Sequence, residues 1–226
     1  MIELITELFA STDWSEIATE SLNTLYMLAG SLLLTTLLGV PLGIFLFLTG
    51  PDQLWSNKPV YMLVGFIVNL LRSIPFIILV VILASVQAII FPTSLPGVAD
   101  IVVMLTVGAV PFLARLVETA LREVDRGIIE ATQSMGARVG QIVWSALLPE
   151  ARPSLIAAIT VTGITLVGYT AMAGIIGAGG LGDLAIRYGY QRNQMDITII
   201  CVVLLLVFVQ VQQVIGDRLV IHFSRK

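Results

Sequence analysis

Few side chains in this sequence combine into a pattern that could carry out covalent or metal chemistry. The single cysteine, Cys201, lies in an apolar run, and the single histidine, His222, lies in the C-terminal tail. Metal sites need clusters of Cys, His or acidic ligands, and hydrolases need a nucleophile beside a base. Neither pattern is visible, so the sequence predicts no catalytic residue, no metal site and no cofactor in this chain.

One glycine-rich segment invites a phosphate-binding interpretation. Residues 177–182 read Gly-Ala-Gly-Gly-Leu-Gly, but a dinucleotide loop needs a strand before it and a helix after it. This segment follows a long apolar run instead, so we interpret it as a tight turn on the outer side of a membrane. The neighbouring Asp183, Arg187 and Arg192 either contribute to a contact there or belong to a solvated loop.

Composition narrows the class of protein. Of the 226 residues, 57% are apolar and 12% are charged, and the mean hydropathy is +0.98, whereas soluble domains have about 45–50% apolar and about 25% charged residues. A soluble enzyme, a disordered chain, a nucleic-acid binder and a disulfide-stapled domain are therefore excluded. The sequence predicts an all-α polytopic membrane protein with a single domain over residues 1–226.

The apolar segments predict five spans, since about 20 apolar residues cross the hydrocarbon core. A break at residues 72–75 separates an interfacial or tilted elbow at 59–71 from the second span, and Pro92 and Pro96 predict a turn after it. The first segment lacks the basic start of a cleaved signal peptide, so we expect it to be retained. The expected spans are residues 22–48, 74–91, 98–116, 154–176 and 197–215.

The basic residues predict the orientation of these spans. Lys and Arg are absent from residues 1–20, whereas the segment between the third and fourth spans and the C-terminal tail are rich in them. Cytoplasmic loops carry an excess of Lys and Arg. We therefore expect the N-terminus outside and the C-terminus in the cytoplasm.

The polar segment at residues 121–152 is the most informative part of the chain. Asp125 is a suitable N-cap for a short helix through Met135, and Gly136 can end that helix in a left-handed conformation. A second short helix over about 139–147 should stop before Pro149. Such a helix pair exposes apolar side chains unless another surface covers them.

The same segment resembles the EAA loop of ABC importer permeases. The matching residues are Glu130-Ala131-Thr132, then Gly136, then Ala146-Leu147-Leu148-Pro149; Thr132 and Ala146 depart from the usual alanine and isoleucine. The resemblance implies a type I importer permease fold, in which short cytoplasmic coupling helices dock on a separate ATPase subunit that binds ATP and Mg. The alternative is a loop that folds back on its own membrane domain. The resemblance implies that Glu130, Ala131 and Gly136 lie at the contact with the ATPase. The coupling-loop residues as a whole are Asp125, Glu130, Ala131, Gly136, Leu148 and Pro149.

A narrower resemblance covers nearly the whole chain. Residues 66–79, 105–115 and 168–182 are similar to the permease subunits of methionine uptake systems. This similarity implies a homodimer in the lipid of the bacterial inner membrane, two ATPase subunits and an extracytoplasmic, lipid-anchored methionine-binding protein. Two alternatives stay open: the same architecture with another small amino acid or nutrient, and a non-ABC channel or scaffold.

Four residues are candidates for the translocation path. Arg72 either lines that path or extends to the cytoplasmic interface, as intramembrane charges often do. Tyr169 and Met172 lie three positions apart and share a helix face, and Thr170 lies between them in a segment rich in small residues. We expect Met172 to contribute to a gate at the dimer axis, although the same residues also suit ordinary helix packing. At the end of the third span, Arg115 and Glu118 should form a local ion pair.

Overall fold

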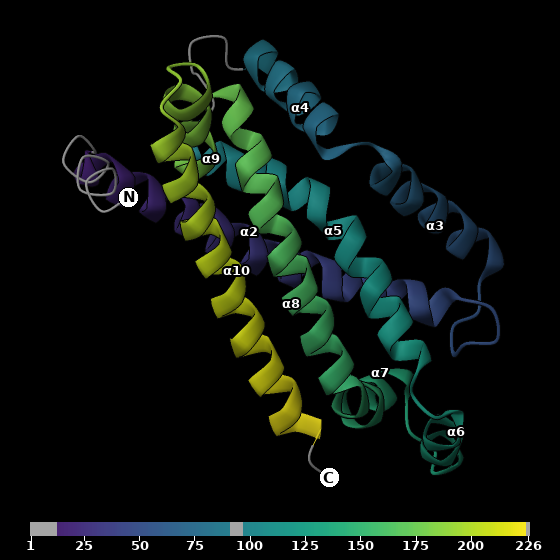
Figure 1. Ribbon diagram of the computed structural model, residues 1–226. Helices are drawn as coiled ribbons and strands as arrows, with labels where there is room; N and C mark the ends of the chain where they lie inside the picture. Colours follow the sequence, from purple (N-terminus) through teal and green to yellow (C-terminus); the bar gives the residue numbers. More distant parts are fainter. Residues whose placement is uncertain (1–12, 91–96, 225–226) are drawn as a thin grey trace. The chain divides into compact units, whose positions relative to one another are not determined.

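The computed structural model describes residues 13–90 and 97–224, and every regular element in that part of the chain is a helix. Four long helices dominate it, and Figure 1 shows their course. By length and composition four helices could cross a membrane, or five if α3 and α4 are one broken span. The predicted all-helical membrane fold is thereby confirmed. The long helices are α2 (Trp14–Thr49), α5 (Val98–Arg122), α8 (Leu148–Ala173) and α10 (Met195–Ser224).

The predicted elbow is a regular helix, α3 (Lys58–Ser73), capped by the side chain of Asn57, which accepts a hydrogen bond from the backbone N–H of Val60. The helix ends where Ile74 takes an extended conformation before Pro75, as the residue before a proline is expected to do. The following helix, α4 (Phe76–Ile90), has only 15 residues. The predicted turn at Pro92 and Pro96 lies outside the described residues.

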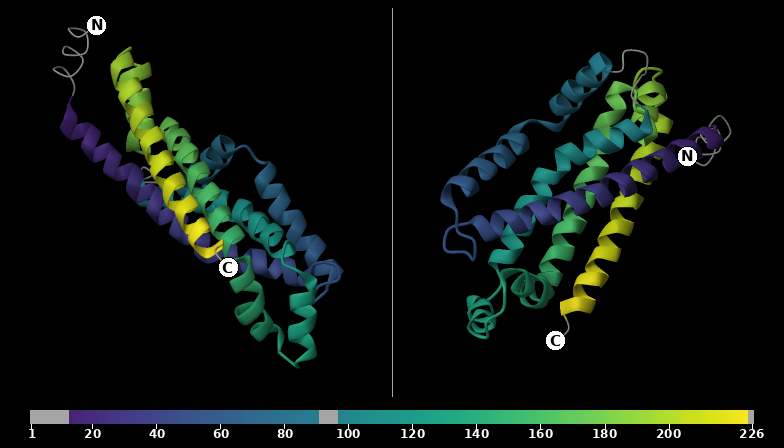
Figure 2. Two further views of the ribbon diagram at one scale, coloured as in Figure 1. Left: turned by 60° about the horizontal axis from the view of Figure 1, so that its bottom comes forward. Right: turned by 180° about the vertical axis from the view of Figure 1, so that it is seen from behind.

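Two short helices form the segment between α5 and α8. Helix α6 (Arg126–Ser134) and helix α7 (Val139–Ile142) lie beyond the C-terminal end of α5 and the start of α8, and all views agree on this placement (Figures 1 and 2). The prediction that the second of these helices stops before Pro149 is wrong. A π-helical turn, Val143–Leu147, joins α7 directly to α8. Pro149 has no N–H to donate, but it closely follows the π-helical turn, where the regular α-helical hydrogen-bond pattern is already interrupted.

The glycine-rich segment is also more helical than expected. After α8 come a 3₁₀ turn, Gly174–Ile176, the helix α9 (Gly180–Leu184) and a π-helical turn, Ala185–Tyr190. Between the 3₁₀ turn and α9 a loop of three residues remains, Gly177, Ala178 and Gly179. Gly177 has the left-handed conformation. The interpretation of residues 177–182 as one tight turn is therefore corrected, because α9 begins within it and all five of its residues are buried.

The chain divides into two compact units, each with its own core. The first unit has Leu181, Leu184 and Cys201 at its centre. In the second unit, the end of α5 and the residues just after it, 113–124, pack against residues 143–158 around Leu121 and Leu147, both fully buried. The first unit comprises the described residues of 1–31, 75–105 and 165–211, and the second those of 32–74, 106–164 and 212–226.

Candidate functional site: the helical loop between α5 and α8

The geometry of α6 agrees with its sequence. The carboxylate of Asp125 accepts a hydrogen bond from the backbone N–H of Gly127 at 2.7 Å, which makes Asp125 the predicted N-cap. At the other end Gly136 has a φ of +80°, a conformation that glycine adopts without steric cost. Both predicted ends of this helix are confirmed, with Met135 as its C-cap.

The outer side of the helix pair carries large exposed apolar side chains. Met135 is 79% exposed and Trp144 is 76% exposed, and Glu130 and Ala131 are exposed on α6. An open depression of about 680 Å³ lies between the two short helices. Exposed apolar side chains around a depression are typical of a contact surface for another protein. The depression is lined by Thr132, Met135, Gly136, Ala137, Gln141, Trp144 and Ser145.

The inner side of the same segment is anchored. Val143 and Leu147 are buried in the second unit's core, where they join Leu121 and Val124 at the end of α5. Leu148 and Pro149 are half-buried at the start of α8. The helix pair thus presents an exposed face while its base is part of a packed core.

A buried carboxylate connects α5 with α3 in this unit. Glu118 is only 3% exposed; its Oε2 accepts a hydrogen bond from Nη1 of Arg115 at 2.6 Å, and its Oε1 accepts one from Nη2 of Arg122 at 2.8 Å. The predicted Arg115–Glu118 pair is confirmed. Tyr61 of α3 donates to Oε1 of Glu118 at 3.0 Å, and the carbonyl of Gly65 accepts from Nη2 of Arg115 at 3.0 Å. We call these five residues the Glu118 cluster.

The cluster members beyond Arg115 and Glu118 were not anticipated from the sequence. The spacing of Glu118 and Arg122 by four positions is a signal that could have identified the second arginine. Tyr61 and Gly65 lie more than fifty residues earlier in the chain, and no local pattern relates them to α5.

Arg72 lies at the other end of α3. Its side chain is exposed, and its guanidinium carbon is 5.8 Å from the centre of the Phe112 ring, within the range of a cation–π contact. The structure thus places Arg72 over α5, which is compatible with either interpretation of this residue.

The other path candidates lie in the first unit and differ from one another. The ring of Tyr169 stacks on Phe76 with 4.0 Å between the centroids. Thr170 is buried and donates to the carbonyl of Val167. Met172 is 44% exposed. Of these three residues, only Met172 presents a substantially exposed side chain.

Side chains of α2 hold the start of α9 in the first unit. The carboxylate of Glu20 accepts a hydrogen bond from the backbone N–H of Gly180, and Oγ1 of Thr24 accepts one from the backbone N–H of Leu181 at 2.8 Å. These contacts satisfy N–H groups that a helix start leaves without internal partners. Neither contact could be foreseen from spacing, because about 160 residues separate the partners.

An ion cluster lies beside this contact. Asp183, 4% exposed, accepts a hydrogen bond from Nε of Arg187 at 2.6 Å, so the interpretation of Asp183 as part of a solvated loop is wrong. Burial lowers the pKa of Arg187, but the hydrogen bond and charge of Asp183 outweigh it. The nearby charges of Glu16 and Glu20 act in the same direction, and the net pKa of Arg187 is raised.

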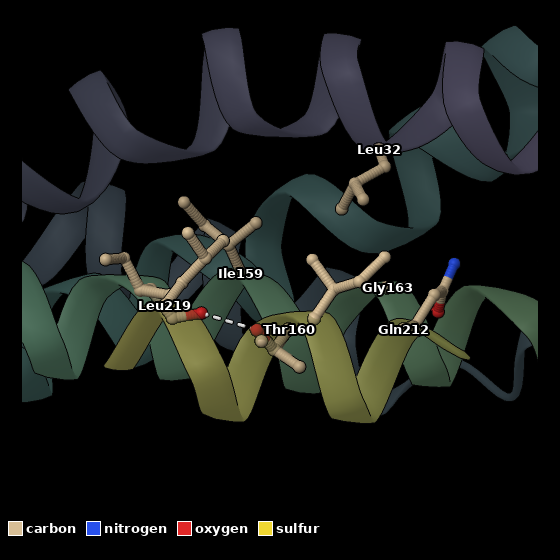
Figure 3. A pocket seen from close by; sticks show the side chains of 9 residues that line it. Leu32, Ile159, Thr160, Gly163, Gln212 and Leu219 are labelled. Carbon is tan, nitrogen blue, oxygen red and sulfur yellow. Dashed lines mark hydrogen bonds between the residues drawn. The ribbon is translucent and has the colours of Figure 1, made fainter. Parts of the chain in front are cut away.

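An apolar groove of about 380 Å³ lies in the second unit. Figure 3 shows Leu32 facing Gly163 and Thr160 across it, with Gln212 and Leu219 at opposite ends. Thr160 donates to the carbonyl of Ile156 on its own helix. Oε1 of Gln212 is buried without a hydrogen-bond partner within the described residues, so the groove offers one acceptor on an otherwise aliphatic lining.

Residues 39–225 match the family described as the inner membrane component of binding-protein-dependent transport systems. The chain belongs to this family. It is 47% identical, over 89% of both chains, to a probable D-methionine transport system permease of Vibrio cholerae. It is 46% identical, over 92% of this chain and 94% of the relative, to a methionine import system permease of Bacillus subtilis.

A solved structure gives the same answer for the fold. An inward-facing structure of the MetNI methionine ABC transporter matches with a TM-score of 0.90 and 44% identity, over 94% of this chain and 98% of that chain. The expected resemblance to methionine permeases and the type I importer fold are therefore confirmed. The chain is a transport-system membrane component and not an enzyme, and the alternative of an unrelated channel or scaffold is excluded.

Proposed function

We propose that this permease imports methionine across the inner membrane, driven by ATP hydrolysis in a separate subunit. The observation that carries the proposal is the 47% identity, over 89% of both chains, to a relative named as a D-methionine permease. An aligned region of 202 residues includes the three segments on which the resemblance rests, residues 66–79, 105–115 and 168–182. Another small amino acid is the nearest alternative substrate, and the preference for the D or L form of methionine is open.

The assembly that follows is a homodimer with two cytoplasmic ATPase subunits. These subunits bind ATP and Mg, and an extracytoplasmic, lipid-anchored protein delivers methionine and makes the main substrate selection. In this arrangement the chain forms one domain with its N-terminus outside and its C-terminus in the cytoplasm. The basic residues at the cytoplasmic ends of the spans support that orientation.

The loop at residues 121–152 is the coupling element in this proposal. Closure of the ATPase pair draws the two loops of the dimer together, and the loops move α5 and α8. The exposed Glu130, Ala131 and Gly136 contact the ATPase, Asp125 holds the start of α6, and Leu148 and Pro149 join the loop to α8.

The translocation path in this proposal runs along α8 at the dimer axis. The exposed Met172 is the gate residue, since a flexible methionine can close a narrow channel and adapt to what passes. Tyr169 holds the helix on which Met172 is presented through its stacking on Phe76, and Thr170 bonds to Val167 within that helix. Arg72, on α3, is a further candidate residue for this path.

Uptake of labelled methionine tests the proposal. Vesicles with this permease, its ATPase and its binding protein should accumulate methionine only with ATP. Glu130→Arg should abolish that uptake, because the charge on the contact surface is reversed. Asp217→Arg makes the same charge reversal at an exposed position near the end of α10 and should leave uptake intact.

The outcomes separate the parts of the proposal. If the binding protein stimulates ATP hydrolysis but no methionine is taken up, the proposal that methionine is the substrate is wrong. Uptake that survives Glu130→Arg would contradict the coupling surface.

A further inference from the structure

Within the second unit, two polar contacts attach helix α3 to α5, and Val68 of α3 also packs in one buried cluster with Ala114 of α5. The Glu118 cluster joins α5 to the first half of α3, through Tyr61 and Gly65. The contact of Arg72 with Phe112 joins the two helices again at the end of α3. Figure 2 shows α3 following the C-terminal half of α5 in both views. Contacts spread along one helix oppose its rotation as well as its separation from α5.

We infer that Glu118 is a positioning residue that makes α3 move together with α5 when the coupling loop is displaced. The inference rests on the proposed function, since it assigns a role within ATP-driven transport. It extends the coupling element from the loop at residues 121–152 to helix α3.

Glu118 is suited to this role because its carboxylate joins three other side chains. Both of its oxygens are used, one by Arg115 and one by Arg122 and Tyr61. A carboxylate buried to this degree is stable only with charged partners and hydrogen bonds. If the carboxylate is neutralised, Arg115 and Arg122 both lose the negative charge with which they pair.

Arg115 carries the connection from this carboxylate to the backbone of α3. Its Nη2 donates to the carbonyl of Gly65, and a Cβ at position 65 would lie only 3.0 Å from that nitrogen. This distance is tighter than an ordinary contact. A methyl group there would displace the guanidinium of Arg115 by a few tenths of an ångström while every charge of the cluster stays in place.

The coupling loop is joined firmly to the same part of α5. Val143 and Leu147, which follow α7, pack in one buried cluster with Leu121 and Val124. Packed cores shift between discrete arrangements and do not deform continuously. A displacement of the loop therefore moves the end of α5, and the Glu118 cluster passes that movement to α3.

The alternative is that Glu118 only neutralises the arginines around it. In that case its loss lowers stability and reduces ATP hydrolysis and transport in parallel. A coupling role predicts a different result, in which hydrolysis continues while transport fails. The ratio of methionine imported to ATP hydrolysed distinguishes the two roles.

Glu118→Gln in the complete transporter, with its ATPase and binding protein in vesicles, provides the first test. We expect the number of methionine molecules imported per ATP to fall roughly tenfold, while ATP hydrolysis stays within about twofold of wild type. Asp100→Asn is the matched control, because it removes one negative charge from the first turn of the same helix and should leave the ratio unchanged. An unchanged ratio in Glu118→Gln, or a parallel loss of both activities, would overturn the inference.

A distance measurement tests the movement itself without any transported substrate. Spin labels at Met62→Cys on α3 and Thr119→Cys on α5, both exposed positions, are introduced in a Cys201→Ser background. With the cluster intact, the distance between the labels should be the same before and after ATP binding. In Glu118→Gln and in Gly65→Ala it should change with ATP or broaden.

Gly65→Ala keeps every charge, so it preserves the test if Glu118→Gln fails to assemble. An ATP-independent distance in both variants would overturn the inference even if methionine uptake proceeds as proposed. Conversely, a wild-type transporter that imports no methionine contradicts the proposed substrate and leaves the distance test intact.

Discussion

The two units of this permease solve one problem, joining a long helix to a distant segment, by different chemistry. In the second unit, α5 is joined to α3 through the Glu118 cluster, in which several charged side chains and a hydroxyl share one carboxylate. In the first unit, α2 is joined to α9 through hydrogen bonds from backbone N–H groups to single side-chain acceptors. In the second unit the carboxylate keeps other donors if one is lost. In the first unit each backbone N–H has a single side-chain acceptor, and no other acceptor replaces it.

This difference bears on where substitutions can be tolerated. A cluster of four polar side chains can lose one donor and keep the others. The first unit also holds α9 against the end of α8 by close approach of their backbones, for which Gly174 and Gly182 make room: added Cβ atoms there would meet the backbone atoms of Asp183 and Ala171 at well below 3 Å. Side-chain adjustment cannot relieve a clash with backbone.

The largest effect should therefore come from Gly182→Ala in the first unit. Its new methyl group would lie 2.5 Å from the carbonyl oxygen of Ala171, and the backbone of α8 or α9 must shift. We expect a loss of about 3 kcal/mol in the free energy of unfolding, the upper part of the range for overpacking. Thermal unfolding of the purified permease in detergent micelles measures it.

The matched control lies in the second unit. Gly140 in α7 has no atom within 4 Å of an added Cβ, and alanine is favoured over glycine in a helix by about 1 kcal/mol. Gly140→Ala should thus keep or slightly raise stability. If Gly182→Ala unfolds at the same temperature as Gly140→Ala, the close approach of α9 to α8 is wrong.

The second prediction concerns the single acceptors of the first unit. Thr24→Val keeps the shape of the side chain but removes the oxygen that accepts from the N–H of Leu181, a fully buried residue. An unsatisfied buried N–H costs about 1–3 kcal/mol, so we expect a loss near 2 kcal/mol, measured by the same unfolding experiment.

Thr36→Val is the control for this change. Thr36 lies on the same helix and donates to the carbonyl of Leu32, one turn earlier. Because that carbonyl belongs to the helix ladder, removal of the hydroxyl leaves no backbone group unpaired and should change little. If the two variants lose the same free energy of unfolding, the hydrogen bond between Thr24 and Leu181 does not contribute to stability.

The same distinction between local and distant contacts explains what the sequence could predict. The N-cap Asp125, the left-handed Gly136 and the Arg115–Glu118 pair depend on residues within a few positions of one another, and all three are present. The apolar segments likewise predicted the long helices, because burial in a bilayer requires length and apolarity alone.

What the sequence could not predict depends on partners far apart in the chain. The attachments of Tyr61 to Glu118 and of Thr24 to Leu181 join segments separated by 57 and 157 residues. The continuous helix through Pro149 was missed for a local reason. Proline usually interrupts a helix, and the sequence does not show that a π-helical turn precedes Pro149 and changes the hydrogen-bond pattern there.

The smallest effect should come from Tyr61→Phe in the Glu118 cluster. Phenylalanine removes a hydroxyl that donates to Oε1 of Glu118 at 3.0 Å, but Arg115 and Arg122 still satisfy both carboxylate oxygens. A typical hydrogen bond contributes about 1 kcal/mol, and because the arginines remain we expect a loss no larger than that. Tyr26→Phe, at an exposed position of α2, is the control and should be neutral.

The losses in the free energy of unfolding of Tyr61→Phe and Thr24→Val show whether the two units differ in the redundancy of their contacts. If the ion cluster is redundant, the loss in Tyr61→Phe must be clearly smaller than the loss in Thr24→Val, although each variant removes one hydroxyl. Equal losses would mean that Glu118 depends on Tyr61 as strictly as Leu181 depends on Thr24. The Glu118 cluster would then lack redundancy, and α3 would depend more strongly on the contact of Arg72 with Phe112 and on the packing of Val68 with Ala114.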